Sequence, residues 1–172
     1  MNPCTAQFAA AACGAPIHRA GIHAFEPEGA RFDAITMTDV LEHVPEPRSI
    51  LREARTLLAP GGWLAVKVPN GPAQRLKEKA RGHVRPGYRP TLADNLVHVN
   101  HFSPVSLRMA LTREGFDQIA IDAGAPELPP NGTLAAVADR AARLAAFRAA
   151  RWLPGGIHSP LAFNLQAYAR RS

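Results

Sequence analysis

The hydrophobic and polar positions of the chain repeat with two different periods, which predict helices in some stretches and strands in others. Residues 47–58 carry apolar side chains at i, i+1, i+4, i+7 and i+8, a spacing that forms one apolar face on a helix. Residues 31–39 are rich in β-branched and apolar side chains, and residues 63–68 form a near-continuous apolar run, as expected of buried strands. A helix between two such strands is typical of parallel pairing, so the pattern predicts an α/β fold.

The remaining pattern predicts further elements of a single domain. We expect helices at 3–13, between 103 and 115, and at 134–152, and strands at 16–18, 116–122 and 161–169. Glycines and prolines interrupt residues 71–95, so we expect a basic, irregular insertion or lid there. No internal repeat and no low-complexity linker divides the sequence, so residues 1–172 are expected to form one domain.

The composition excludes several classes of protein. Hydrophobic residues make up 47% of the 172 residues and charged residues 20%, which is typical of a globular chain and not of a disordered tail, a coiled coil or a collagen-like fibre. No apolar run approaches the ~18 residues of a membrane span, so we expect no membrane partner. Cys4 and Cys13 are nine residues apart, which fits neither a zinc clip nor a redox pair and indicates reduced thiols in a cytoplasmic protein.

The basic residues are concentrated in part of the chain. The formal net charge is +6, and residues 67–89 carry seven Lys or Arg against a single acidic residue, Glu78. Aromatic residues make up only 6% of the chain and do not interleave this stretch, so we expect no nucleic-acid partner. The stretch is expected to be either a solvated basic surface or a binding site for an anionic small molecule.

Three runs of sequence carry a recognisable pattern. They are F-D-A-I-T-M-T-D-V-L-E-H-V-P-E-P at 32–47, L-L-A-P-G-G-W-L-A-V-K-V-P-N at 57–70, and H-V-N-H-F-S-P-V-S-L at 98–107 followed by E-G-F at 114–116. Together they resemble class I S-adenosylmethionine-dependent methyltransferases, of the small-molecule branch that includes ubiquinone-biosynthesis O-methyltransferases. The resemblance runs from about residue 2 to residue 172. It implies a Rossmann-like sheet, S-adenosylmethionine as cofactor, and methyl transfer to a small-molecule acceptor whose nucleophile is oxygen, nitrogen or carbon.

The resemblance also implies roles for particular residues. Ligands of open α/β sheets bind beyond the carboxyl ends of the strands, and residues 39–43 and 68–71 leave two such ends. On this basis, the residues expected on the cofactor side are Asp39, Leu41 and Glu42. The residues expected on the substrate side, as catalytic candidates, are His43, His98 and His101. Either His98 or His101 is expected to act as a general base or to make structural hydrogen bonds at the entry to the next helix.

One of these runs can also be interpreted as a metal-binding site. Asp39, Glu42 and His43 form a set of two carboxylates and an imidazole that could hold Mg²⁺ or Mn²⁺. The ubiquinone-pathway enzymes resemble this, with an acidic residue before L-E-H or I-E-H as a metal site. Because Asp39 is shorter than the glutamate of that pattern, we expect these side chains to brace the following helix and to bind no metal.

Parts of the family pattern have no match in this sequence. The family holds its cofactor with a Gly-rich turn after the first strand and an acidic residue at the end of the second, whereas no G-x-G run occurs among the 172 residues. Because residues 3–13 resemble the helix after the second strand, we expect a truncated sheet that lacks its first two strands. The strand expected at 16–18 then either pairs directly with residues 32–39 or leaves a sheet edge open.

Three explanations of this departure stay open. The sequence is a fragment with a misplaced start, a degenerate copy that no longer binds cofactor, or a chain completed by a second chain that supplies the Gly-rich half. The alternative to a methyltransferase is therefore a non-catalytic remnant or partner-binding module that keeps the fold without binding cofactor alone.

Overall fold

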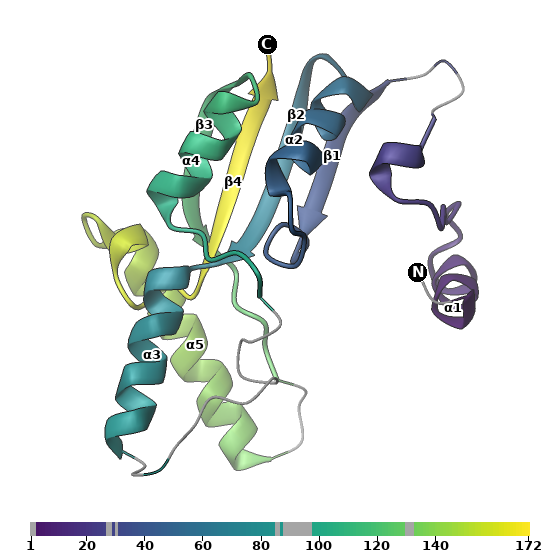
Figure 1. The fold of residues 1–172 in the computed structure, drawn as a ribbon. Coiled ribbons are helices and arrows are strands. Elements are labelled where there is room, and N and C mark those ends of the chain that lie inside the picture. The colour runs from purple at the N-terminus through teal and green to yellow at the C-terminus, as the bar shows by residue number, and fades with distance from the viewer. Residues whose placement is uncertain (1–2, 27–28, 30, 85–86, 88–97, 130–132) are drawn as a thin grey trace.

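The computed structural model describes residues 3–26, 29, 31–84, 87, 98–129 and 133–172, which form a four-stranded mixed sheet with helices around it (Figure 1). The strands are β1 (Phe32–Thr38), β2 (Leu58–Pro69), β3 (Phe116–Gly124) and β4 (Asn164–Arg171), and their order in the sheet is β1-β2-β4-β3. β1 and β2 are parallel, while β4 runs antiparallel to both of its neighbours. The carboxyl ends of β1 and β2 therefore lie at the same edge of the sheet.

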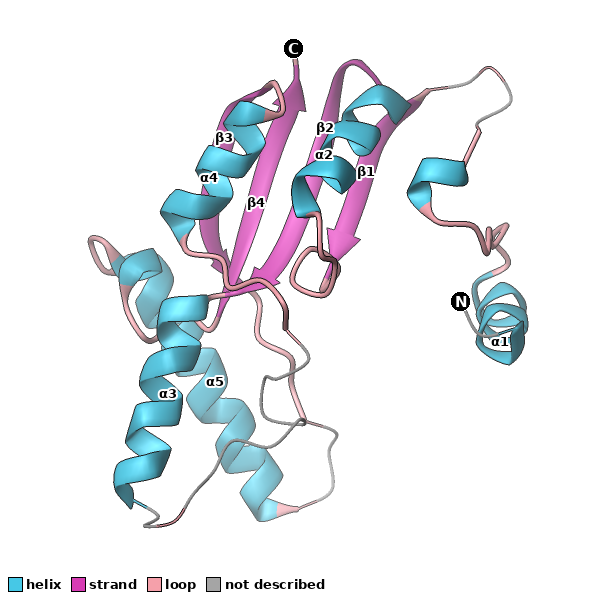
Figure 2. Ribbon diagram, in the orientation of Figure 1, coloured by secondary structure: helices cyan, strands magenta, loops and turns pink. Residues whose placement is uncertain are grey.

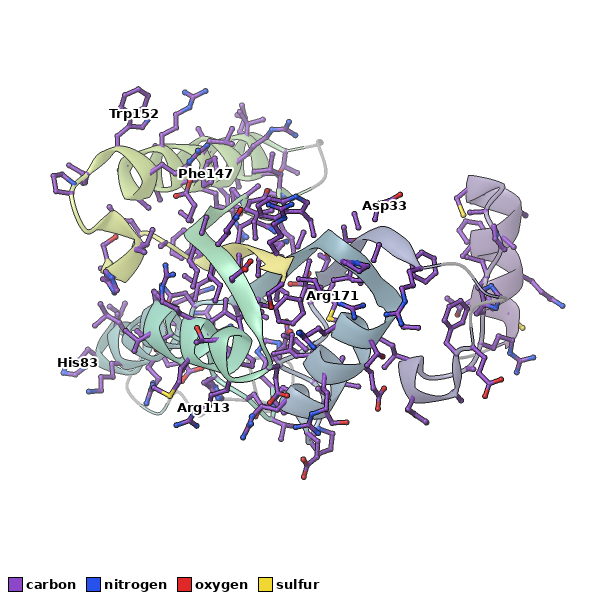
Figure 3. The ribbon with its side chains drawn as sticks, turned by 90° about the horizontal axis from the view of Figure 1, so that it is seen from above. Asp33, His83, Arg113, Phe147, Trp152 and Arg171 are labelled. Atoms are coloured by element: carbon purple, nitrogen blue, oxygen red, sulfur yellow. The ribbon has the colours of Figure 1, made fainter. Side chains whose placement is uncertain are left out.

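Five α-helices accompany the strands in this part of the chain. They are α1 (Pro3–Cys13), α2 (Pro47–Leu57), α3 (Gly71–Val84), α4 (Pro104–Arg113) and α5 (Leu134–Trp152). α2 and α4 cover one face of the sheet (Figure 2), and α5 packs against β3 from the opposite side (Figure 3). None of these helices is both long enough and apolar enough to cross a membrane.

The core lies between the sheet and the helices α2 and α4. Alternate residues of β2 and β4 face these helices, and each is almost completely buried: Leu64, Val66, Val68, Leu165, Ala167 and Ala169. The helices contribute Leu51, Ala54, Leu107 and Leu111 to the same cluster. The intervening strand positions lie on the opposite face, where Trp63 is 43% exposed and Tyr168 is 48% exposed. The alternation of a β-strand thus gives this sheet one apolar, covered face and one more open face.

An ion-pair cluster joins α2 to the end of α4. Glu114 accepts hydrogen bonds from the Nε atoms of Arg48 at 2.6 Å and Arg52 at 3.0 Å, and its side chain is only 4% exposed. Two charge-assisted hydrogen bonds to a buried carboxylate stabilise this helix contact more than an exposed ion pair would.

We expect Glu114→Ala to lower the free energy of unfolding by about 1–3 kcal/mol, because both arginines lose a charged acceptor. Urea denaturation followed by circular dichroism measures the change. The matched control is Asp117→Asn, an exposed carboxylate three residues away on β3, for which we expect a change within about 0.5 kcal/mol. Equal stability of the Glu114→Ala variant and the unsubstituted chain would show that the cluster does not stabilise the fold.

The structure confirms the α/β class, the parallel pairing of β1 and β2, and the helices and strands expected from 31 onward. The strand expected at 16–18 is wrong: these residues form no strand, and Pro16 lacks the N–H that a ladder hydrogen bond needs. The described part of the sheet accordingly ends at β1, and no described strand pairs with its outer edge. This agrees with the open sheet edge that was one of the two expected outcomes.

The irregular segment expected at 71–95 is also wrong over its first part, because Gly71–Val84 is the helix α3. Pro72 suits the first turn of a helix, and the residues from Ala73 to Arg81 are nearly all strong helix formers. Gly82, which suggested a break, lies close to the end of the helix, where its flexibility matters little. Apart from Gly87, the rest of this segment lies outside the described residues.

Candidate functional site

A pocket of about 550 Å³ lies at the carboxyl ends of β1 and β2. Its lining comes from the segment after β1, the last residue of β2, α3, α5, the first residue of β4 and the loops before α4, α5 and β4: Asp39, Glu42, His43, Pro69, Ala73, Gln74, Lys77, Arg81, His98, Pro126, Glu127, Asp139, Arg143, Phe163 and Asn164. This is the place where open α/β sheets bind ligands. Basic and acidic side chains both line it, so it suits a ligand that carries charge.

Asp39 directly follows β1 with a positive φ of 54°, and its N–H donates to the carbonyl of Lys67 on β2 at 3.0 Å. Its carboxylate Oδ2 lies 3.7 Å from Lys67 Nζ, which also lies 3.5 Å from Glu127 Oε1. Burial raises the pKa of the Asp39 carboxyl, and nearby Glu127 raises it further, while Lys67 opposes both effects. One ammonium thus bridges two carboxylates at the pocket wall.

Glu42 is the most unusual side chain of the site. It is only 1% exposed, and neither carboxylate oxygen has a hydrogen-bond partner among the described residues. Burial raises the pKa of this carboxyl, with a smaller contribution from Asp39. Its nearest imidazole nitrogen is Nε2 of His43, at 4.0 Å from Oε1, which is too long for a hydrogen bond. A buried carboxylate without a partner is a place where a cationic ligand would be stabilised.

The loop that carries His98 is fixed against the segment after β1. The backbone N–H groups of Val99 and Asn100 donate to the carbonyl of Glu42 at 2.8 and 3.0 Å. The amide Nδ2 of Asn100 donates to the carbonyls of Leu41 at 3.2 Å and Val44 at 2.6 Å. These bonds bring the rings of His98 and His43 to a centroid distance of 4.9 Å. Burial lowers the pKa of His98, and the neighbouring His43 lowers it further.

The structure brings four of the six predicted residues together at the pocket: Asp39, Glu42, His43 and His98. Leu41 is completely buried in the core, so its side chain does not face the pocket. His101 is exposed and does not line the pocket. Sequence reasoning missed Glu127, which reaches Lys67 from a Pro-rich loop, because nothing in the local sequence marks that contact.

Comparison with known proteins identifies the protein family to which the chain belongs. The sequence profile of the family described as Methyltransferase domain matches residues 6–121, and the chain belongs to this family. The family's cofactor is S-adenosylmethionine, as the sequence predicted. A solved structure from Bacillus halodurans, described as a putative methyltransferase, is 13% identical, with a TM-score of 0.55 over 99% of this chain and 80% of that one. The plantazolicin methyltransferase, solved in complex with S-adenosylhomocysteine, is 12% identical, with a TM-score of 0.50 over 89% of this chain and 57% of that one. Both likenesses confirm the fold.

Two curated relatives are similar over shorter stretches. The ubiquinone biosynthesis O-methyltransferase of Chromobacterium violaceum is 54% identical over 41 residues, which are 24% of this chain and 17% of that protein. The enzyme of the same name from Paraburkholderia phytofirmans is 46% identical over 37 residues, which are 22% of this chain and 16% of that protein. The matched stretch therefore spans about a sixth of the length of either relative.

Proposed function

We propose that this chain takes part in S-adenosylmethionine-dependent methyl transfer to a small-molecule acceptor bound in the pocket at the ends of β1 and β2. The observation that carries the proposal is the pocket itself, which has carboxylates at the carboxyl end of a parallel strand in a chain of the methyltransferase family. When bound, S-adenosylmethionine would supply the methyl group of a sulfonium, which passes in line to the acceptor nucleophile as the carbon–sulfur bond breaks and S-adenosylhomocysteine leaves. The protein's part in such a reaction is mostly to orient the reactants and exclude water.

The residues present fit the charged end of the cofactor. Asp39 stands at the pocket wall directly after β1, where its carboxylate can accept a hydrogen bond from the amino group of the cofactor's methionine end. Lys67 holds this carboxylate in place at 3.7 Å. For the nucleoside end, the sequence offers no G-x-G turn whose backbone a ligand could approach closely.

The part of the pocket proposed to hold the acceptor has two histidines, His43 and His98, and several basic side chains. His98 has a lowered pKa, so its ring is mostly neutral near pH 7 and can take a proton from an acceptor hydroxyl. Its Nδ1 atom is buried without a hydrogen-bond partner among the described residues. Lys77 and Arg81 line the same pocket from α3, and their charges favour an acceptor that carries a negative group, whereas Arg143 pairs with Asp139 at 2.9 Å.

The test of this proposal is calorimetric titration of the folded full chain with S-adenosylhomocysteine. We expect saturable binding of one equivalent. No heat at millimolar ligand, with folding confirmed by circular dichroism, would contradict the proposal that this chain alone forms the cofactor site.

A second candidate function is a partner-binding module of the same fold. The observation that favours it is the outer edge of β1, which pairs with no described strand and presents Phe32, Ala34 and Thr36 as exposed residues. Such an edge is a template for a strand from a second chain, including one that carries a Gly-rich turn. This function predicts no binding of S-adenosylhomocysteine by the chain alone.

A further inference from the structure

Three arginines gather at the end of the sheet opposite the pocket. Arg31 precedes β1, Arg55 lies in the last turn of α2, and Arg171 ends β4, which runs antiparallel to β2. All three therefore lie near the amino ends of β1 and β2, whereas the pocket lies at the carboxyl ends of these strands (Figure 1). None of the three lines the pocket, and neither function proposed above uses them.

Two of the guanidinium groups share the same pair of backbone acceptors. Nη1 of Arg31 donates to the carbonyl of Thr56 at 2.7 Å and to that of Leu58 at 3.5 Å. Nη1 of Arg171 donates to the carbonyl of Thr56 at 3.4 Å and also to that of Leu58. Because both groups use the same two carbonyls, they are direct neighbours.

Arg55 adds a third positive charge beside this pair. Its Nε donates to the carbonyl of Gly115 at 3.0 Å, and its Nη2 donates to that of Ser172 at 3.4 Å. Burial lowers the pKa of Arg171, and the charges of Arg31 and Arg55 lower it further. The three guanidinium groups are therefore close enough to repel one another.

No acidic side chain balances these charges in the part of the chain that the structure describes. None of the three arginines pairs with an Asp or Glu there. The carbonyls at the end of α2 attract the guanidinium groups, but they carry only partial negative charge. Nε of Arg171 is buried without a hydrogen-bond partner among these residues, and Arg31 donates from Nη1 alone. Positive charge and N–H donors are thus left over, and buried donors without a partner are rare.

We propose that Arg31, Arg55 and Arg171 bind a phosphate group at the amino ends of β1 and β2. The planar fork of a guanidinium matches the oxygens of a phosphate, and one phosphate can accept N–H groups from more than one arginine. Arg31 is exposed and Arg171 is only partly buried, so a ligand can reach them from solvent. The negative charge of the ligand offsets the repulsion among the three arginines. The ligand class is inorganic phosphate or the phosphate group of a small molecule.

The test is calorimetric titration of the folded full chain with inorganic phosphate and, separately, with phenyl phosphate, at an ionic strength held constant with sodium chloride. We expect one saturable site. We expect Arg31→Gln and Arg171→Gln each to weaken binding about 10-fold or more, because each removes charge-assisted hydrogen bonds. Tighter binding of phenyl phosphate would assign the site to an organic phosphate, and equal or weaker binding would assign it to the free anion; each of these results supports the site.

The matched control is Arg108→Gln on α4. Nη1 of Arg108 also donates to a backbone carbonyl, that of Ile119 at 2.7 Å, but its charge is not one of those that act on Arg171. This variant loses the same charge and a similar hydrogen bond, so it should keep the affinity of the unsubstituted chain.

The proposal is overturned if neither phosphate binds saturably, if Arg31→Gln binds as tightly as the unsubstituted chain, or if Arg108→Gln weakens binding as much as Arg31→Gln. The first of these results would mean that the arginines only cap the end of α2. If Arg171→Gln does not fold, the variant at the exposed Arg31 decides. The titration uses no S-adenosylhomocysteine, so its outcome is independent of the proposed methyl transfer.

Discussion

Replacing Asp39 by asparagine is expected to weaken the binding of S-adenosylhomocysteine by roughly 10–100-fold. The substitution removes the negative charge that pairs with the ligand's ammonium, and hydrogen bonds to charged groups contribute about 1.5–3 kcal/mol. Calorimetric titration of both proteins measures the ratio. The matched control is Asp33→Asn, an exposed carboxylate at the other end of β1 (Figure 3), which should leave the affinity unchanged.

The same contact predicts a dependence on pH. Binding of the ammonium needs the ionised carboxylate, and the pKa of Asp39 lies above its ordinary value because of burial and Glu127. As the pH falls, Asp39 is therefore protonated earlier than an exposed aspartate, and affinity is lost over that range. Equal affinities in the Asp39→Asn and Asp33→Asn variants, or an affinity independent of pH down to acid unfolding, would rule out this role for Asp39.

Leu165→Ala is expected to lower the free energy of unfolding by about 2–5 kcal/mol. Leu165 is completely buried on β4, the strand between β2 and β3, where it pairs with Val68 and Ala123. Its loss leaves a cavity in the middle of the core that a regular sheet cannot close. Urea denaturation measures the change in stability.

The control for this substitution is Gln166→Ala, next to Leu165 on the same strand but on the other face of the sheet. We expect a change of less than about 1 kcal/mol, because this side chain belongs to no part of the apolar core. Comparable losses in the two variants would mean that the face toward α2 and α4 is not the stabilising one.

An element of the fold is predictable from the sequence where neighbouring residues determine it, and is not predictable where contacts between distant residues determine it. α2 and β2 were predictable, because α2 has a strong helical period and β2 contains a near-continuous apolar run. The place of β4 between β2 and β3 was not, since pairing partners are chosen by contacts far apart in sequence. α3 was missed because glycines and prolines near its end outweighed the helix propensity of its centre.

The residues of the candidate site also differ in whether the local sequence predicts their contacts. Asp39, Glu42 and His43 are neighbours in one motif, so a single strand end predicts that they lie together. The contact of His98 with this motif depends on Asn100, whose amide reaches two carbonyls of the earlier segment. Lys67 sits in a basic stretch for which a solvated surface and an anion-binding site were the two expectations, yet it lies between two carboxylates, Asp39 and Glu127. Such pairing depends on tertiary structure, and no local sequence signal carries it.

Hydrogen exchange followed by mass spectrometry shows whether the ends of β1 and β2 hold the cofactor. The full chain is compared with and without saturating S-adenosylhomocysteine. We expect slower exchange of the backbone amides at 39–43 and 98–102, which adjoin the pocket. Unchanged exchange in both segments, or protection confined to α1 and α2, which do not line the pocket, would contradict it.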